Sequence, residues 1–74
     1  MKVSKSIESV SSEAKSLIEQ KLEYEGYSKE SIEGSTARFL NDGRIRVSIE
    51  DTKFNVVLAL NGDGKVVISQ FHVA

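Results

Sequence analysis

Three turn signals divide the second half of the chain, and they constrain its fold more than any other feature. They are Asn41-Asp42-Gly43, Glu50-Asp51-Thr52-Lys53 and Asn61-Gly62-Asp63-Gly64, and the apolar residues between them alternate with a period of two. Three turns between alternating segments predict four antiparallel strands in a meander. We expect these strands at about residues 35–40, 44–50, 53–60 and 65–73.

The first half of the chain has a helical pattern instead. Its apolar residues recur at steps of three and four, which places them on one stripe of a helix. We expect this helix at about residues 4–25, and its serines also allow a start at Ser11 or Ser12. Gly26 is the expected end, because glycine adopts the left-handed conformation after a last helical turn without steric cost. The stripe consists of Ile7, Val10, Ala14, Leu17, Ile18 and Leu22.

These patterns predict the α+β class: an N-terminal helix packed on one face of a four-stranded antiparallel β-meander, with residues 1–74 as a single domain. A chain of 74 residues buries only about 60% of the surface that its unfolded form exposes, so its stability margin is thin. The sequence has no cysteine, which excludes disulfides and thiolate metal sites as a supplement. Association with a second chain would supply further buried surface.

The N-terminal residues predict where the protein resides. Met1-Lys2-Val3-Ser4-Lys5 begins like the basic region of a signal peptide, but residues 6–13 are too polar to form the apolar segment that would follow. We therefore expect a cytoplasmic protein. No apolar run approaches the ~20 residues that cross a bilayer, so we expect no membrane span.

Loop lengths predict which strand residues face the helix. A three-residue first loop with a left-handed Gly43 directs Ala37 and Phe39 to the core, whereas a two-residue loop would direct Arg38 there. We expect the three-residue loop. In the central hairpin, a two-residue loop at Asp51-Thr52 is expected. It pairs Ile49 with Phe54, Val47 with Val56, and Ile45 with Leu58.

The last hairpin is expected to have a two- or four-residue loop around Gly62-Asp63. Either length pairs Leu60 with Lys65. The last strand then directs Val67, Ser69 and Phe71 to the core side and leaves the alternate residues on the opposite face.

A single helix covers only one side of a four-stranded sheet, so the opposite face is predicted to meet solvent or another molecule. Isolated valines on a wet strand are the simpler interpretation, since β-branched residues favour strands. However, the last strand has no charge after Lys65 and no proline or glycine, so it lacks the usual features that prevent pairing at a sheet edge. The predicted face comprises Arg38, Arg44, Arg46, Ser48, Asn55, Val57, Ala59, Val66, Ile68, Gln70 and His72.

From this face we expect a small non-catalytic protein-binding or regulatory module. It is expected to self-associate as a homodimer, or to bind another protein, through its sheet face or its last strand. The residues expected to contact the partner are Val57, Ala59, Val66, Ile68, Gln70, Arg38, Arg44 and Arg46.

No residue constellation indicates an enzyme, a metal site or a cofactor site. His72 is the single histidine, and no cysteine is available to act with it. The turn at Asn61 resembles part of a calcium loop, but Lys65 and His72 occupy its fifth and twelfth positions, which require oxygen ligands. Glu19 and Glu23 lie one helical turn apart and are expected to be solvated, since paired catalytic carboxylates require a cleft.

Nucleic-acid binding is the alternative function. Arg38, Arg44 and Arg46 would contact phosphates from one sheet face, with Asn55 and Gln70 beside them. The phenylalanines all point to the predicted core, so no aromatic residue lies among the arginines to stack on bases. The net charge of −1 also lacks the basic excess that is typical of such proteins.

A second interpretation of residues 28–40 changes the fold. The apolar residues from Ile32 to Leu40 also fit a helical spacing, and a second helix here would give a winged-helix arrangement that enters the DNA major groove. Gly34 would weaken the middle of that helix. A short helical turn at Ser28–Glu33 is an intermediate solution.

The order of a helix, Gly26-Tyr27, a strand, and then the segments 46–49, 54–58 and 61–67 resembles PepSY-type domains. The resemblance covers about residues 12–68 and consists of a helix and alternating strands with a D-G-K-V-like turn. It implies a non-catalytic module that binds or restrains another protein, often a peptidase, usually outside the cytoplasm. The sequence shows no export signal for such a location, and no functional residue is carried over.

Overall fold

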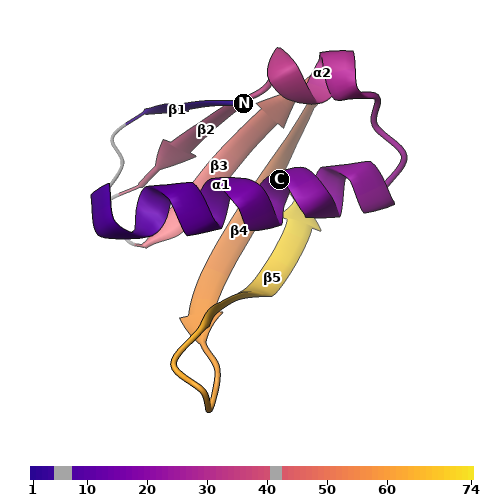
Figure 1. The fold of residues 1–74 in the computed structure, drawn as a ribbon. Coiled ribbons are helices and arrows are strands. Elements are labelled where there is room, and N and C mark those ends of the chain that lie inside the picture. Colours follow the sequence, from indigo (N-terminus) through magenta and orange to yellow (C-terminus); the bar gives the residue numbers. More distant parts are fainter. Residues whose placement is uncertain (5–7, 41–42) are drawn as a thin grey trace.

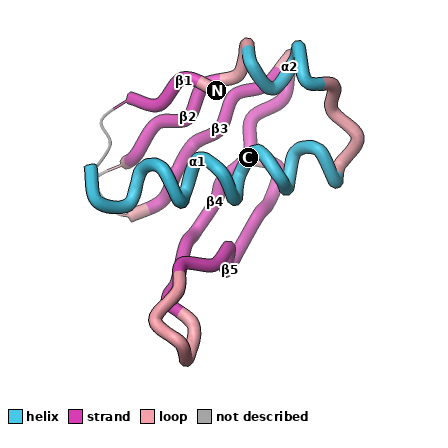
Figure 2. Tube along the Cα trace, viewed as in Figure 1, coloured by secondary structure: helices cyan, strands magenta, loops and turns pink. Residues whose placement is uncertain are grey.

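A computed structural model describes residues 1–4, 8–40 and 43–74, which form two layers. Figure 1 shows the long helix α1 lying across one face of the β-sheet, with the short helix α2 at one end, and Figure 2 shows the same arrangement as a tube. The predicted α+β class, with a helix on an antiparallel meander, is confirmed. The elements are β1 (Lys2–Ser4), α1 (Glu8–Tyr24), α2 (Lys29–Glu33), β2 (Thr36–Phe39), β3 (Arg44–Ile49), β4 (Thr52–Leu60) and β5 (Val66–Val73).

The sheet contains one strand that the sequence pattern did not predict. Its strand order is β1-β2-β3-β4-β5, and the antiparallel meander of β2 to β5 is extended by β1, which pairs parallel with β2. The expectation of a helix from residue 4 is therefore wrong, because Ser4 belongs to β1 and α1 begins at Glu8. Ile7 of the predicted stripe lies outside the described residues. A strand of three residues is too short to show a period of two, so its parallel pairing has no local signal.

The described part of the apolar stripe, from Ala14 to Leu22, packs on the sheet as predicted. Ala14, Ile18 and Leu22 are buried, and Leu17 is half-buried at the side of the stripe. The helix ends as expected near Gly26, whose φ is +99°. The amide of Gly26 donates to Glu23 over 3.0 Å and the amide of Tyr27 donates to Leu22 over 3.1 Å, which are the two hydrogen bonds of a Schellman motif.

Residues 28–40 form a short helix followed by a strand, so the winged-helix interpretation is wrong and the intermediate solution is confirmed. Ser28 caps α2, since its side-chain oxygen accepts a hydrogen bond from the amide of Ser31 over 3.2 Å. The helix buries Ile32. After α2, the buried hydroxyl of Ser35 donates to the carbonyl oxygen of Ile32, and the chain becomes extended as β2.

The first hairpin has the predicted three-residue loop. The amide of Leu40 donates to the carbonyl of Arg44 over 2.8 Å, and Gly43 is left-handed with a φ of +88°. Ala37 pairs with Val47, and Phe39 pairs with Ile45, so these residues share the core face.

The central hairpin has a two-residue loop one residue earlier than expected. Ile49 pairs with Thr52, so the loop is Glu50-Asp51 and the predicted register is shifted by two residues. Glu50 takes a φ of +52°, a conformation that sequence signals assign to glycine or asparagine. A shift of two preserves the faces, and the observed core pairs are Val47 with Phe54 and Ile45 with Val56.

The last hairpin has a three-residue loop, and the expected pairing of Leu60 with Lys65 is wrong. The amide of Asn61 donates to Lys65 over 2.9 Å, the amide of Gly64 donates to Asn61 over 3.0 Å, and Gly64 has a φ of +76°. These bonds repeat the geometry of the first loop. Leu60 consequently pairs with Val66.

A bulge in β5 then changes the alternation. Leu58 pairs with Ile68 but Val57 pairs with Gln70, which leaves Ser69 as the extra residue. Before the bulge, Val66 and Ile68 lie on the core side and Val67 lies opposite, contrary to the prediction. After it, Phe71 pairs with Val56 on the core side, as predicted.

The core lies between the helices and one face of the sheet. Phe54 packs against two other aromatic rings: its ring centroid lies 4.7 Å from that of Phe71 and 6.2 Å from that of Tyr27. Leu58, Ile68 and Phe71 pack against the core at its margin. The buried apolar residues are Ala14, Ile18, Leu22, Ile32, Ala37, Ile45, Val47, Ile49, Phe54 and Val56. Within the described ranges, neither helix has the length and apolarity needed to cross a membrane.

Candidate functional site

One face of the sheet is left uncovered by the helices. The buried residues of α1 and α2 belong to a single core with the strand residues of the other face, so both helices lie on that side. We call the uncovered side the open face. Among the strands with described side chains it is formed by Thr36, Arg38, Arg44, Arg46, Ser48, Lys53, Asn55, Val57, Ala59, Val67, Gln70 and His72.

The residues of the open face form rows across the strands. Arg38 pairs with Arg46, Arg46 with Asn55, and Asn55 with His72, so one polar row spans β2 to β5. The Nε of Arg46 donates to Oδ1 of Asn55 over 2.7 Å. The Nε2 of His72 lies 3.4 Å from Oε1 of Gln70 in the adjacent row. This arrangement presents several hydrogen-bond donors on one nearly continuous surface.

Charges are segregated between the two layers. The open face carries three arginines and Lys53, and none of its described side chains is acidic. Arg38 and Arg46 are direct cross-strand partners, and like charges in such positions are destabilising. The helix layer is acidic, because Glu13, Glu19, Glu23, Glu25, Glu30 and Glu33 outnumber Lys15, Lys21 and Lys29 among its described side chains.

The structure divides the residues that were expected to bind a partner. Arg38, Arg44, Arg46, Val57, Ala59 and Gln70 do lie on the open face. Val66 and Ile68 lie on the opposite side, where Ile68 packs against the core. The cause is the three-residue loop at Gly62–Gly64, which reverses the alternation that a two- or four-residue loop would give.

Three members of the open face, Thr36, Lys53 and Val67, were missed by the sequence analysis. Lys53 has the same parity as Asn55 in β4, so the alternation itself could have identified it. Val67 was missed because its face depends on which glycine of the last loop is left-handed. In the structure this is Gly64, which closes a three-residue loop in the way that Gly43 closes the first one.

β5 is an edge strand, since it stands at the end of the strand order and pairs with β4. The amide of Asn61 donates to the carbonyl of Lys65, and along an antiparallel pair the hydrogen-bonded positions alternate. The backbone groups of Val67 therefore point to β4, and those of Val66 and Ile68 point outward. Beyond the bulge, the amide of Ala74 donates to the carbonyl of Lys53 over 2.8 Å, and this bond determines in the same way which residues of β5 point their backbone groups to β4. This edge has no charged side chain from Val66 to Val73.

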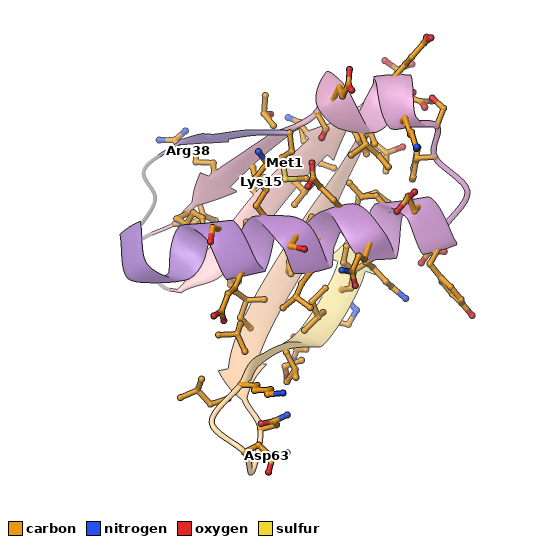
Figure 3. The ribbon with its side chains drawn as sticks, viewed as in Figure 1. Met1, Lys15, Arg38 and Asp63 are labelled. Carbon is orange, nitrogen blue, oxygen red and sulfur yellow. The ribbon has the colours of Figure 1, made fainter. Side chains whose placement is uncertain are left out.

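An open groove lies beside the same edge, on the helix side. The β4–β5 hairpin extends past α1, and Asp63 lies at its tip (Figure 3). The groove between hairpin and helix has a volume of about 320 Å³ and is lined by Glu13, Ser16, Leu17, Lys65 and Val66. Leu60, at the end of β4, is 69% exposed. Apolar side chains are therefore accessible on the helix side of the hairpin.

A second groove is lined mainly by glutamates, and its residues do not indicate a metal site. It has a volume of about 210 Å³ and is lined by Glu19, Glu23, Lys29, Ile32 and Glu33. Glu23 is exposed, as expected, whereas Glu19 is half-buried, and its Oε2 lies 3.4 Å from the amino group of Met1. Among the described residues, no three histidine, cysteine, aspartate or glutamate side chains are placed so that they could hold a metal ion together.

Comparisons of the chain with protein-family models, with curated proteins and with solved structures found no match. The resemblance to PepSY-type domains therefore rests on the order of helix and strands alone.

Proposed function

We propose that this chain is a non-catalytic protein-binding module that self-associates through β5. The uncharged edge of β5 carries this proposal, because its outward backbone groups can form hydrogen bonds with a strand of a second copy. The resulting sheet would be continuous across the two copies.

The outward groups favour one register. Val66 and Ile68 both present their backbone N–H and C=O outward, and the bulge at Ser69 interrupts this pattern. In an antiparallel pair centred on Val67, Val66 of one copy would bond to Ile68 of the other, twice by symmetry. The two Val67 side chains would then be direct neighbours on the open face.

This pairing also buries apolar surface on both sides of the sheet. On the helix side it brings together Val66, Ile68 and the exposed Leu60 of both copies. On the open face it places Val57 and Ala59 beside the two Val67 side chains. The apolar residues expected to bind a partner would thus meet at one edge, although they lie on two faces.

A charge pair at position 67 tests the register. Val67→Lys and Val67→Glu each place like charges opposite one another across the symmetry axis, so each variant is expected to sediment as a monomer. An equimolar mixture of the two variants places opposite charges there, and is expected to restore the dimer. Sedimentation velocity over a wide concentration range measures both effects.

The matched controls separate pairing from folding. Thr36→Lys adds the same charge on the open face but in β2, far from the β5 edge, and should leave the dimer intact. Val66→Pro removes an outward N–H and should weaken association, whereas Val66→Thr keeps the N–H and should not. A monomeric wild-type chain, or a Val67→Lys variant that dimerises like the wild type, contradicts the proposal.

A further inference from the structure

We infer that the open face is a binding site for the phosphate backbone of duplex nucleic acid, independent of the pairing of β5. The site consists of Arg38, Arg44, Arg46 and Lys53, with the amides of Asn55 and Gln70 and the ring of His72 as further hydrogen-bonding groups. Arginine and lysine contacts to phosphates supply most of the sequence-independent affinity of nucleic-acid-binding proteins.

The first argument is the juxtaposition of two like charges on the face. Arg38 and Arg46 are direct cross-strand partners, and no carboxylate lies among the described side chains of the face. This arrangement costs folding stability, and an anionic ligand relieves the cost. The hydrogen bond from Arg46 to Asn55 involves Nε, and therefore leaves the two terminal nitrogens of the guanidinium available to a ligand.

The second argument is that the acidic helix layer does not cancel the field at the open face. The helices pack on the other side of the sheet, so the two packed layers separate their carboxylates from the arginines. Charges separated by more than the Debye length, about 8 Å at physiological salt, are largely screened. A phosphate on the open face would therefore respond to the nearby arginines rather than to the net charge of −1.

The third argument distinguishes nucleic acid from an acidic protein. A protein interface requires an apolar centre, but the rows that contain Arg38, Arg46 and Lys53 have only polar partners. The apolar residues of the face lie at its β4–β5 end. Phe39, Phe54 and Phe71 belong to the other side of the sheet, so the described open face presents no phenylalanine, tyrosine or tryptophan ring to stack on unpaired bases. A duplex backbone fits this surface better than a single strand does.

Fluorescence anisotropy with labelled mixed-sequence DNA and RNA duplexes tests the inference. Four neutralised phosphates give a slope of log affinity against log salt of about −3.6, so affinity should fall about 150-fold between about 50 and about 200 mM salt. The double variant Arg38→Gln/Arg44→Gln should lose at least tenfold in affinity at the lower salt, with a slope of about −1.8. Lys53→Gln, which removes one positive charge, should change the slope by about half as much as the double variant does.

The matched control is Lys15→Gln/Lys29→Gln, which removes two exposed positive charges from the helix layer. It changes the net charge equally and should leave duplex affinity within twofold of the wild type. Circular dichroism confirms that the variants are folded. Absence of binding to both duplexes, an equal loss in the two double variants, or displacement of the duplex by poly-glutamate at equal charge concentration would overturn the inference. The last outcome would assign the face to an acidic protein.

Discussion

The three-residue loop of the β4–β5 hairpin decides the faces of β5, and two glycine substitutions test it. Gly64 has a φ of +76°, whereas Gly62 lies outside the left-handed region. A Cβ at either position would meet no atom within 4 Å. Alanine at each site therefore reports on backbone conformation alone.

The two substitutions should change the free energy of unfolding in opposite directions. Gly64→Ala forces a left-handed alanine, which costs about 1–2 kcal/mol, and regains about 0.4–1 kcal/mol from the reduced freedom of the unfolded chain. The net effect is a destabilisation of about 1 kcal/mol. Gly62→Ala has only the second contribution and should stabilise the protein by about 0.4–1 kcal/mol.

Thermal unfolding followed by circular dichroism, at one protein concentration, measures the difference. In a domain of this size, 1 kcal/mol corresponds to a change in Tm of about 4–8 °C, so the variants should differ by about 10 °C. The alternative is a two-residue loop at Gly62-Asp63, which would make Gly62 left-handed. If Gly62→Ala lowers Tm as much as Gly64→Ala does, our assignment of Val66 and Ile68 to the core side is wrong.

Two further substitutions test the packing and the loop. Ile18→Ala removes a side chain that is 1% exposed between α1 and the sheet, and should reduce the free energy of unfolding in urea by about 2–4 kcal/mol, while Lys15→Ala on the exposed side of the same helix should change it by less than about 0.5 kcal/mol. Equal effects would show that α1 is not packed through Ile18. Asn61→Ala removes the oxygen that accepts hydrogen bonds from the amides of Asp63 (2.9 Å) and Lys65 (3.0 Å); because the loop is exposed, we expect a loss of about 1 kcal/mol in the same assay, and an unchanged stability would contradict this role.

The arginine part of the candidate site could be predicted from the sequence. Gly43 readily adopts the left-handed conformation that closes a three-residue loop. This loop length places Arg38 on the side of the sheet opposite Ala37 and Phe39. The shift of two residues in the central hairpin left Arg44 and Arg46 on the same face, because a strand has a period of two. These placements depend on the local conformation of the loop and on the alternation of faces along a strand, and both can be predicted from the sequence.

The apolar part could not be predicted in the same way. The position of Val66 and Ile68 depends on whether the loop before them has an odd or an even number of residues. Asn61-Gly62-Asp63-Gly64 contains two glycines, and turn preferences alone do not show which of them becomes left-handed. The prediction for these two residues failed at this choice.

By itself, the sequence determined one helix, the four meander strands and the glycine that ends α1, because periodicity and backbone sterics act over a few residues. Only the tertiary structure decided the parallel pairing of β1, the turn at Glu50 and the bulge at Ser69. The bulge illustrates the physical reason. After the loop reversed the alternation, the extra residue returned Phe71 to the core side, where its ring lies 4.7 Å from that of Phe54. Packing a phenylalanine ring against the core contributes up to about 1.5–3 kcal/mol, and that gain depends on residues distant in the sequence.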